Sequence, residues 1–229
     1  SVISRTCETL VKKLDTPSLL AKLLELPSDY EYFSKLLETG IPDPQAIQIN
    51  LRKYETLYKM CFEEFSLSYF KNFIHRKLYV RKNSDYQKRI LANALIFLNK
   101  DTNFLNDFID IIFNDSNNMT LKVSCLITYI VKKDEEENVN KFYLKYGKDK
   151  SLLNKWFAMQ MQYSTPELAL YRLRELTKHK DFNMFNPNNF NSLIGTFAKR
   201  NFHAFHQMNG AGYKVIAEWI KKIDAENPQ

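Results

Sequence analysis

The clearest pattern of apolar and polar positions begins at Asp43 and predicts one long amphipathic helix. Apolar residues recur there at alternating steps of four and three, at Ile47, Leu51, Tyr54, Tyr58, Cys61 and Phe65. Such steps bring side chains to one face of an α-helix, where they form a stripe that must be buried. Asp43 can cap this helix, and Pro44 suits its first position. We expect the helix to run to about Lys71.

Five other segments show the same helical spacing. Asn117 and Asn118 can cap a helix that begins at Met119, and Thr165 precedes a helix with Pro166 at its first position. The apolar positions of the five segments are Ile90, Leu91, Ala94, Leu95 and Leu98; Phe104, Leu105, Phe108, Ile111 and Ile112; Met119, Val123, Leu126 and Ile130; Leu152, Leu153, Trp156 and Phe157; and Ala169, Leu170, Leu173 and Leu176. No segment alternates strictly between apolar and polar residues, as a half-buried strand would.

The fold class that follows is all-α, with about a dozen short antiparallel helices stacked as an α–α superhelix in one domain, residues 1–229. Each helix carries one apolar stripe and must bury it against its neighbours in the sequence, which stacked antiparallel pairs achieve. A compact bundle is the alternative arrangement. No fixed period of about 30 to 47 residues is visible, so the sequence does not indicate a regular repeat array.

The composition fits a globular helical chain and narrows its partners. Hydrophobic residues make up 45%, and five Gly and seven Pro are few helix breakers for 229 residues. The net charge of +7 comes from 33 basic against 26 acidic residues, which are spread along the chain. A nucleic-acid surface usually gathers its basic residues on one stripe, so we expect no nucleic-acid partner. A basic nucleic-acid binder is kept as a third hypothesis.

The cysteines and the apolar runs bear on the location of the protein. Cys7, Cys61 and Cys125 are odd in number and far apart, which does not indicate a disulfide framework. Free thiols favour a reducing compartment, and no apolar run reaches the ~18 residues of a transmembrane helix. We therefore predict a cytoplasmic protein without a membrane partner.

The usual signatures of a catalytic centre do not occur in the sequence. A zinc peptidase helix needs His-Glu-x-x-His, because two His four residues apart reach one metal while the Glu acts as base. None of the four histidines belongs to such a motif, and the pair His203 and His206 has no carboxylate within ten residues on either side. Nor is there a Gly-x-Ser-x-Gly turn around a nucleophile. We predict no catalytic residue and no metal ligand in this chain.

The stretch from Phe182 to Phe197 is the most informative local feature. Asn186 can cap a helix that has Pro187 in its first turn, and Phe185 and Phe190 are spaced for a hydrophobic staple. The predicted buried stripe is Phe190, Leu193, Ile194 and Phe197, and the opposite face centres on Asn188, Ser192, Gly195 and Lys199, flanked by Asn189 and Asn191. Free backbone N–H groups at such a helix start can hold a carboxylate or other anion. An ordinary capped helix is the interpretation that the residues alone favour.

A series of short motifs follows along the chain. They are Leu26-Pro27-Ser28, Lys88-Arg89 with Asn93, Asn117-Asn118-Met119-Thr120, Lys155-Trp156-Phe157, Asn186-Pro187-Asn188, Ser192-Leu193-Ile194-Gly195-Thr196-Phe197, Phe205-His206, Gly210-Ala211-Gly212-Tyr213 and Asn227-Pro228-Gln229. In this order they resemble the all-helical C-terminal domain of zinc aminopeptidases of the alanyl aminopeptidase (aminopeptidase N) family. The similarity spans nearly the whole chain.

The resemblance implies a function for the parent protein. Members of the family release N-terminal amino acids from peptides, using one zinc ion held by two His and a Glu in a preceding catalytic domain. Residues 1–229 are then a C-terminal domain fragment that lacks the catalytic domain, ends before the last helices and is inactive alone. We expect no cofactor in the fragment and zinc in the parent enzyme. The expected partners are the catalytic domain of the same polypeptide, which this domain covers, and the peptides that enter the enclosed chamber.

We predict that Asn186, Asn188, Asn189 and Asn191 line this substrate chamber and face the catalytic domain. The family often has arginine at the positions of Asn189 and Asn191, so this chain loses positive charge there and keeps hydrogen-bonding side chains. The alternative function is a helical-repeat scaffold that binds another protein and has no link to peptide hydrolysis.

Overall fold

The computed structural model describes residues 5, 9–11, 13, 16–26, 29–38, 40–41, 43–80, 86–132 and 136–226. Within them all regular structure is helical, and thirteen α-helices occur, which confirms the predicted all-α fold of about a dozen helices. The chain divides into two compact units, one of Ser1–Leu26 with Asn50–Asp134 and one of Pro27–Ile49 with Glu135–Gln229. The single domain over 1–229 stays a prediction. Cys7 and the motif positions 27, 28 and 227–229 lie outside the described residues.

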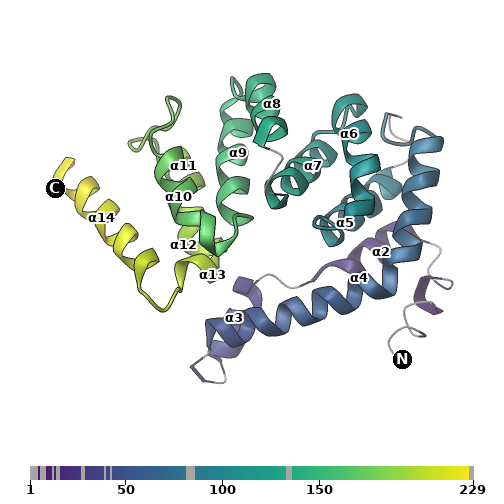
Figure 1. Cartoon of the computed structure of the whole chain (residues 1–229), viewed down its shortest axis with the longest axis horizontal. Helices are drawn as coiled ribbons and strands as arrows, with labels where there is room; N and C mark the ends of the chain where they lie inside the picture. Colours follow the sequence, from purple (N-terminus) through teal and green to yellow (C-terminus); the bar gives the residue numbers. More distant parts are fainter. Residues whose placement is uncertain are drawn as a thin grey trace. The chain divides into compact units, whose positions relative to one another are not determined.

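The first unit is built around one central helix, α7. The unit contains α2 (Pro17–Leu24), α4 (Pro44–His75) from Asn50 onward, α5 (Tyr86–Leu98), the 3₁₀ helix η1 (Asn103–Leu105), α6 (Asn106–Asp115) and α7 (Met119–Val131), as Figure 1 shows. α5 packs against α2 and α7, and α6 packs against α7. Leu121 and every residue from Ser124 to Ile130 are buried. As predicted, Asn118 caps α7, because its side chain accepts a hydrogen bond from the N–H of Leu121 at 3.0 Å.

The long helix predicted from Pro44 forms as α4 and ends about one turn later than expected, at His75. Its cap is Asp43, whose carboxylate accepts a hydrogen bond from the N–H of Gln45 at 2.8 Å, as predicted. The helix belongs to both units, since Ile49 lies in one and Asn50 in the other. Its two ends therefore bury their apolar faces in different surroundings.

The predicted apolar stripe of α4 is wrong beyond its first position. Ile47 is 4% exposed, but Tyr54 is 53% exposed. Leu51, Tyr58, Cys61 and Phe65 are half-buried, and the buried line runs through Phe62, Ser66, Phe70 and Phe73. The six positions span 18 residues, or five turns of 3.6 residues, and so share one face of the helix. Ile47 belongs to the second unit and the later positions to the first, where a different face of α4 is buried.

Two ion pairs connect α4 with the residues that follow α5 in the first unit. Lys59 Nζ lies 2.6 Å from Oδ1 of Asp101, and Lys100 donates a hydrogen bond to the carboxylate of Glu55. Burial raises the pKa of Asp101, but the hydrogen bond and charge of Lys59 and the charge of Lys100 outweigh it, so the net pKa is lowered. The carboxylate is thus held in its charged form by the pairing.

The second unit contains α3, a pair of long helices and a chain of short ones. Its elements are α3 (Asp29–Leu37), the start of α4, α8 (Glu136–Tyr146), α9 (Lys150–Gln162), α10 (Pro166–Leu176), α11 (Pro187–Phe190), the π-helical turn η2 (Asn191–Gly195), α12 (Thr196–Arg200), α13 (Phe202–Phe205) and α14 (Ala211–Glu226). α9 packs against α8, α10, η2 and α12, so it occupies the middle of the unit (Figure 1). Its buried face carries Trp156, whose Nε1 donates to the carbonyl of Val139 at 3.0 Å.

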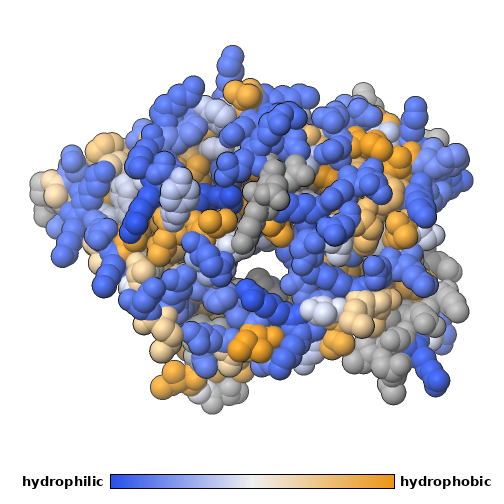
Figure 2. All heavy atoms as spheres, viewed as in Figure 1, coloured by the Kyte–Doolittle hydropathy of each residue, from blue (hydrophilic) through white to orange (hydrophobic). Residues whose placement is uncertain are grey.

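The surface shown in Figure 2 is mainly hydrophilic, with smaller apolar patches between the polar side chains. Exposed apolar residues include Leu144, Tyr171 and Ile220, with exposed fractions between 63% and 77%. No described helix has the length and apolar character needed to cross a membrane.

α14 begins against α13 through a contact that requires glycine. Gly210, just before the helix, has a φ of 69°, in the left-handed region that glycine adopts readily. A Cβ on Gly212 would lie 2.3 Å from the carbonyl oxygen of Phe205 and 2.8 Å from its Cα. Both close atoms belong to the backbone, so they cannot rotate away. Both glycines of the motif Gly210-Ala211-Gly212-Tyr213 are therefore explained by the structure, Gly210 by its backbone conformation and Gly212 by the close contact.

Substitution of Gly212 by alanine tests this contact. We expect Gly212→Ala to destabilise the protein by about 1–3 kcal/mol, the usual cost of overpacking a close contact. Gly40→Ala is the matched control, because a Cβ at Gly40 meets no atom within 4 Å. Thermal unfolding followed by circular dichroism measures both variants. Equal melting temperatures for the two variants would contradict the assigned contact.

Candidate functional site

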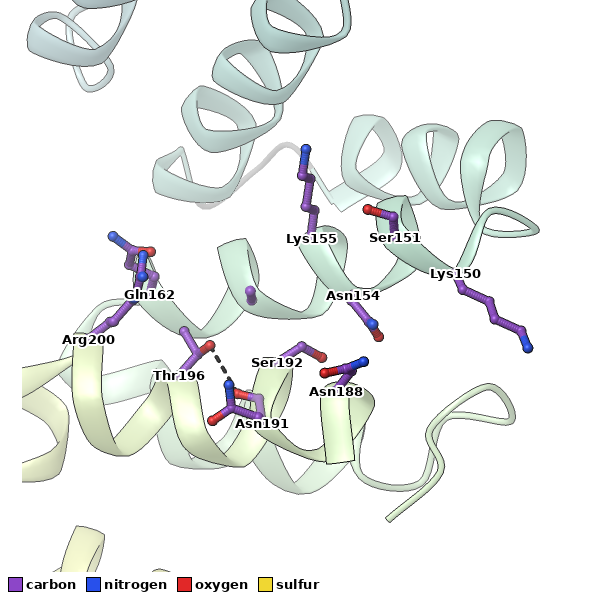
Figure 3. Close-up of a pocket in the computed structure, with 11 residues that line it drawn as sticks. Lys150, Ser151, Asn154, Lys155, Gln162, Asn188, Asn191, Ser192, Thr196 and Arg200 are labelled. Atoms are coloured by element: carbon purple, nitrogen blue, oxygen red, sulfur yellow. Dashed lines mark hydrogen bonds between the residues drawn. The ribbon is translucent and has the colours of Figure 1, made fainter. Parts of the chain in front are cut away.

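A hollow of about 570 Å³ lies in the second unit, between α9 and the helix made of α11, η2 and α12. Its lining residues are Lys150, Ser151, Asn154, Lys155, Ala158 and Gln162 from α9, and Asn188, Asn191, Ser192, Thr196 and Arg200 from the facing helix. They occur in the same order along both helices, with Lys150 and Asn188 at one end and Gln162 and Arg200 at the other (Figure 3). The two helices therefore run side by side in the same direction. We call this hollow the α9–α12 groove.

A buried asparagine holds the two helices together at one end of the groove. Asn189 is 5% exposed, and its Nδ2 donates to Oδ1 of Asn154 on α9 at 2.8 Å. Its Oδ1 accepts a hydrogen bond from the N–H of Asn183 at 2.7 Å. Both ends of this side chain amide are thus used inside the protein, which fixes the start of α11 against α9.

A second buried asparagine does the same at the other end. Asn201 follows α12 and is 5% exposed. Its Nδ2 donates to the carbonyl oxygens of Met161 and Ser164, at 2.7 and 3.0 Å, and these residues lie at the end of α9 and just beyond it. Its Oδ1 accepts from the N–H of Ala204 at 3.2 Å and so caps α13. The width of the α9–α12 groove is therefore set at both ends by the hydrogen bonds of a buried asparagine.

The π-helical turn η2 shapes the floor of the groove. Gly195 closes this turn, and a Cβ there would lie 2.1 Å from Oδ1 of Asn191. Glycine at this position therefore leaves room for the Asn191 side chain. The floor hydroxyls bond within their own helix, since Ser192 donates to the carbonyl of Asn189 at 2.7 Å and Thr196 to that of Asn191 at 3.3 Å. A π-helical turn is rare in proteins and frequently marks a functional site.

The groove is electropositive. Lys150, Lys155 and Arg200 line it, no Asp or Glu does, and none of the three forms an ion pair with any residue that the structure describes. Asp149 is the acid next to Lys150 in the chain. It caps α9, because its carboxylate accepts from the N–H groups of Ser151 and Leu152 at 2.8 and 3.0 Å.

The four predicted chamber asparagines separate into two groups. Asn188 and Asn191 are exposed and line the groove. Asn186 is exposed as the cap of α11, and Asn189 is buried between the helices. The structure therefore brings two of the four together in the groove, and their role in a substrate chamber stays a prediction.

The anion site that the sequence raised as a possibility at the start of this helix is not available. Pro187 has no N–H, and Oδ1 of Asn186 accepts from the N–H groups of Asn188 and Asn189, both at 3.1 Å. The N–H of Phe190 bonds to the carbonyl of Asn186 at 2.8 Å. The ordinary capped helix that the residues favoured is the one that forms, because its own cap uses the donors that an anion would need.

The side-chain predictions for this helix hold in part. Leu193, Ile194 and Phe197 are buried, as expected. Phe190 is covered by another residue than Phe185, the expected partner in a hydrophobic staple. Phe185 is 67% exposed, and the ring of Phe190 lies 5.9 Å from that of Trp219 on α14.

Sequence reasoning missed the α9 side of the groove. The signal was present, because Lys150, Asn154, Ala158 and Gln162 follow one another at steps of four, which places small and polar side chains along one face of α9. That face lies opposite to the apolar positions Leu153 and Trp156 that predicted the helix. Only the packing of α12 on α9 shows that this polar face meets the asparagine face of another helix.

The histidine pair considered as a metal site lies elsewhere in the second unit. His206 follows α13, and its Nδ1 is hydrogen-bonded to the hydroxyl of Tyr213. Its ring lies 5.0 Å from that of Phe202 and 4.9 Å from that of Phe205. Burial among these rings lowers the pKa of His206 below its ordinary value. In the described part of the chain, no group of three or more His, Cys, Asp or Glu is placed to hold a metal ion.

The whole chain, residues 1–229, matches the family described as a domain of unknown function (DUF3458_C) with ARM repeats, and it belongs to that family. ARM repeats are stacked helices that form a superhelix, which agrees with the predicted α–α superhelix. The sequence did not indicate a regular repeat array, because no fixed period is visible in it, and the family match supplies that description.

Curated relatives are aminopeptidases. The chain is 31% identical over 225 residues to aminopeptidase N of Escherichia coli (strain K12), covering 96% of this chain and 25% of that protein. It is 41% identical over 93 residues to aminopeptidase N of Caulobacter vibrioides, covering 41% of this chain and 11% of that protein. The chain thus spans about a quarter or less of the length of these relatives.

A solved structure shares the fold. It is the crystal structure of Legionella pneumophila aminopeptidase A in complex with aspartic acid, with a TM-score of 0.78 over 99% of this chain and 27% of that chain, at 22% identity. These matches together confirm the predicted resemblance to the C-terminal helical domain of the aminopeptidase N family.

Alanine substitution of Asn189 and of Asn188 distinguishes the asparagine that holds the two helices together from one that only lines the groove. We expect Asn189→Ala to lower the free energy of unfolding by about 1–3 kcal/mol, because it leaves the Asn183 N–H and the Asn154 Oδ1 without their partner. Asn188→Ala, at an exposed position in the same turn, should change it by less than about 0.5 kcal/mol. Urea denaturation of the two variants measures the difference. A stable Asn189→Ala protein would show that the helices are held by other contacts.

The lowered pKa of His206 predicts a pH dependence of stability. As the pH falls below about 6.5, the unfolded chain binds a proton that the folded chain does not, so stability decreases in that window. Between about pH 7.5 and pH 5.5, the melting temperature of His206→Gln should therefore fall less than that of the natural protein. Tyr213→Phe keeps the histidine and its ring contacts, and should keep the full decrease. If the melting temperatures of His206→Gln and the natural protein fall equally with pH, the pH dependence does not come from His206.

Proposed function

We propose that this chain is the non-catalytic C-terminal domain of a zinc metallo-aminopeptidase that releases N-terminal amino acids from peptides. In this proposal the domain covers the catalytic domain of the same polypeptide, and the α9–α12 groove forms part of the wall of the substrate chamber. Zinc is held in the catalytic part, and the parent protein works in the cytoplasm without nucleic-acid or membrane partners.

The observation that carries the proposal is the α9–α12 groove. It is concave and polar, and it includes Asn188 and Asn191, two of the residues that the sequence predicts for the chamber. The match to aminopeptidase N over nearly the whole chain supplies the catalytic context. A chamber wall must contact peptides of many sequences, and backbone amides are common to all of them. Exposed side-chain amides suit that task because they both donate and accept hydrogen bonds.

The alternative is a helical-repeat scaffold that binds another protein. The centre of a protein–protein interface is usually depleted of charged residues and enriched in aromatic ones. The α9–α12 groove has three cations and no aromatic residue among its lining. This composition favours a surface for small polar ligands over a protein-docking face.

Hydrolysis of an aminoacyl p-nitroanilide by the purified chain, and by the complete gene product that contains it, tests the proposal. We expect no turnover by the chain with or without added zinc. The complete gene product should hydrolyse the reporter and lose that activity when a chelator removes the metal, because the ligands lie outside this chain.

Two results would contradict this expectation. Zinc-dependent turnover by the purified chain would mean that it carries its own centre. A folded complete gene product without aminopeptidase activity would remove the catalytic context and leave the scaffold alternative.

A further inference from the structure

We infer that His179 is a pH-sensitive anchor, which holds the loop between α10 and α11 against α8 and α9 while the histidine ring is neutral. The loop consists of residues 177–186 and, like these helices, belongs to the second unit. This role concerns the chain alone and does not depend on peptide hydrolysis, so it goes beyond the proposed function.

The ring of His179 is packed among three aromatic rings of α8 and α9. Its centroid lies 4.8 Å from that of Tyr143 on α8. It lies 5.3 Å and 5.6 Å from the ring centroids of Trp156 and Phe157 on α9. The indole of Trp156 is itself fixed, because its Nε1 donates to the carbonyl of Val139 at 3.0 Å. The histidine thus connects the loop to rings that are held in place by the two helices.

A hydrogen bond within the loop requires this ring to be unprotonated at Nδ1. The backbone N–H of Asp181 donates to Nδ1 of His179 at 3.2 Å. A backbone N–H can only donate, so Nδ1 is the acceptor, and a proton on Nδ1 would face the N–H group. Protonation therefore breaks this bond and places a charge in a partly desolvated position. Aromatic faces attract cations, but they replace neither the lost hydrogen bond nor the lost hydration.

Burial and the neighbouring charges together favour the neutral ring. Burial disfavours the imidazolium most strongly, Asp181 favours it and Lys180 disfavours it, so that the pKa of His179 lies below its ordinary value. Tyr143, the titratable group that α8 contributes, stays a neutral donor because its hydrogen bond to Asp181 raises its pKa. The two rings from α9 do not titrate. The loop is therefore held by a neutral histidine at neutral pH.

The loop connects His179 to the α9–α12 groove. Asp181 is a second anchor, since its carboxylate accepts a hydrogen bond from the hydroxyl of Tyr143 at 2.5 Å. Further along the loop, the N–H of Asn183 donates to Oδ1 of Asn189, the residue that holds α11 against α9. Release of the loop thus removes one hydrogen bond of Asn189 and loosens one end of the groove.

The sign of the pH dependence follows from the two states of the loop. In the released loop the ring is solvated, and its pKa returns toward the ordinary value of about 6.5. In the held loop the pKa of His179 is lower. As the pH falls below about 6.5, the released state binds a proton that the held state does not, so release becomes more favourable. The loop is held at neutral pH and is released progressively in acid.

Amide hydrogen exchange of the purified chain, followed by NMR between about pH 7.5 and pH 5.5, tests the anchor. The measured quantity is the protection factor, which is corrected for the intrinsic pH dependence of exchange. We expect the Asn183 amide to be less protected than the amides of α9, because the loop opens locally. Its protection factor should fall about three- to tenfold over this pH range.

Two histidine variants locate the cause. His179→Phe keeps a ring in the aromatic contact and does not titrate, so the protection factor of the Asn183 amide should no longer change with pH. His206→Gln is the matched control, because it removes the other histidine of this unit whose pKa is lowered and keeps His179. This control should keep the full decrease.

Variants of the charged neighbours move the midpoint and keep the histidine. Lys180→Gln removes a charge that disfavours the imidazolium, so the pKa of His179, read from its ring signals, should rise by about 0.3 units or more. Asp181→Asn removes a charge that favours the imidazolium, so the pKa should fall by a similar amount. Lys178→Gln is the matched control, since Lys178 pairs with Glu175, and it should leave the midpoint nearly unchanged.

Three outcomes would overturn the inference. These are the same pH dependence in His179→Phe as in the natural chain, midpoints of Lys180→Gln and Asp181→Asn that move in one direction or not at all, and equal protection of the loop and α9. If His179→Phe does not fold, the two charge variants decide. None of these measurements involves hydrolysis, so their failure leaves the proposed function standing, and an inactive gene product leaves the anchor standing.

Discussion

The hydrogen bonds of two buried asparagines are the constraint on which the second unit depends. Asn189 joins α11 to Asn154 of α9, and Asn201 joins the end of α12 to the carbonyl oxygens of Met161 and Ser164. A buried amide without partners is costly, so each asparagine stabilises only the arrangement that satisfies it. The two helices are thereby held in one register, and the polar faces between them stay open as a groove.

This constraint explains why one run of asparagines contains residues with different roles. Asn186 uses its side chain to cap α11, and Asn189 uses both ends of its amide inside the protein. Asn188 and Asn191 remain exposed and line the groove. An arginine at position 189 would place a charge in a buried site, which requires a partner that an amide does not need. The positive charge of the groove comes from Lys150, Lys155 and Arg200, outside the run.

Local features were predictable because they depend on neighbouring residues in the chain. The caps at Asp43, Asn118 and Asn186 form as expected, since a cap needs only a side chain and the N–H groups of the next turn. The long extrapolated stripe of α4 failed, because it assumed one partner surface along the whole helix. Lys122 shows the same limit in the first unit. It is buried and donates to the carbonyl of Phe113 at the end of α6, a contact with no local signal.

By itself the sequence determined the all-α class, the starts of α4, α7, α10 and α11, and the resemblance to the aminopeptidase C-terminal domain. Helical spacing, caps and motif order depend only on residues close together in the chain or on their order along it. Only the tertiary structure decided that the polar face of α9 lies against the face of Asn188 and Asn191, and that Asn189 is buried between them. Two helix faces meet because of packing and long-range hydrogen bonds between segments more than thirty residues apart, such as Asn154 and Asn189, 35 residues apart. The residues of one helix do not indicate which polar face of another helix will pack against it.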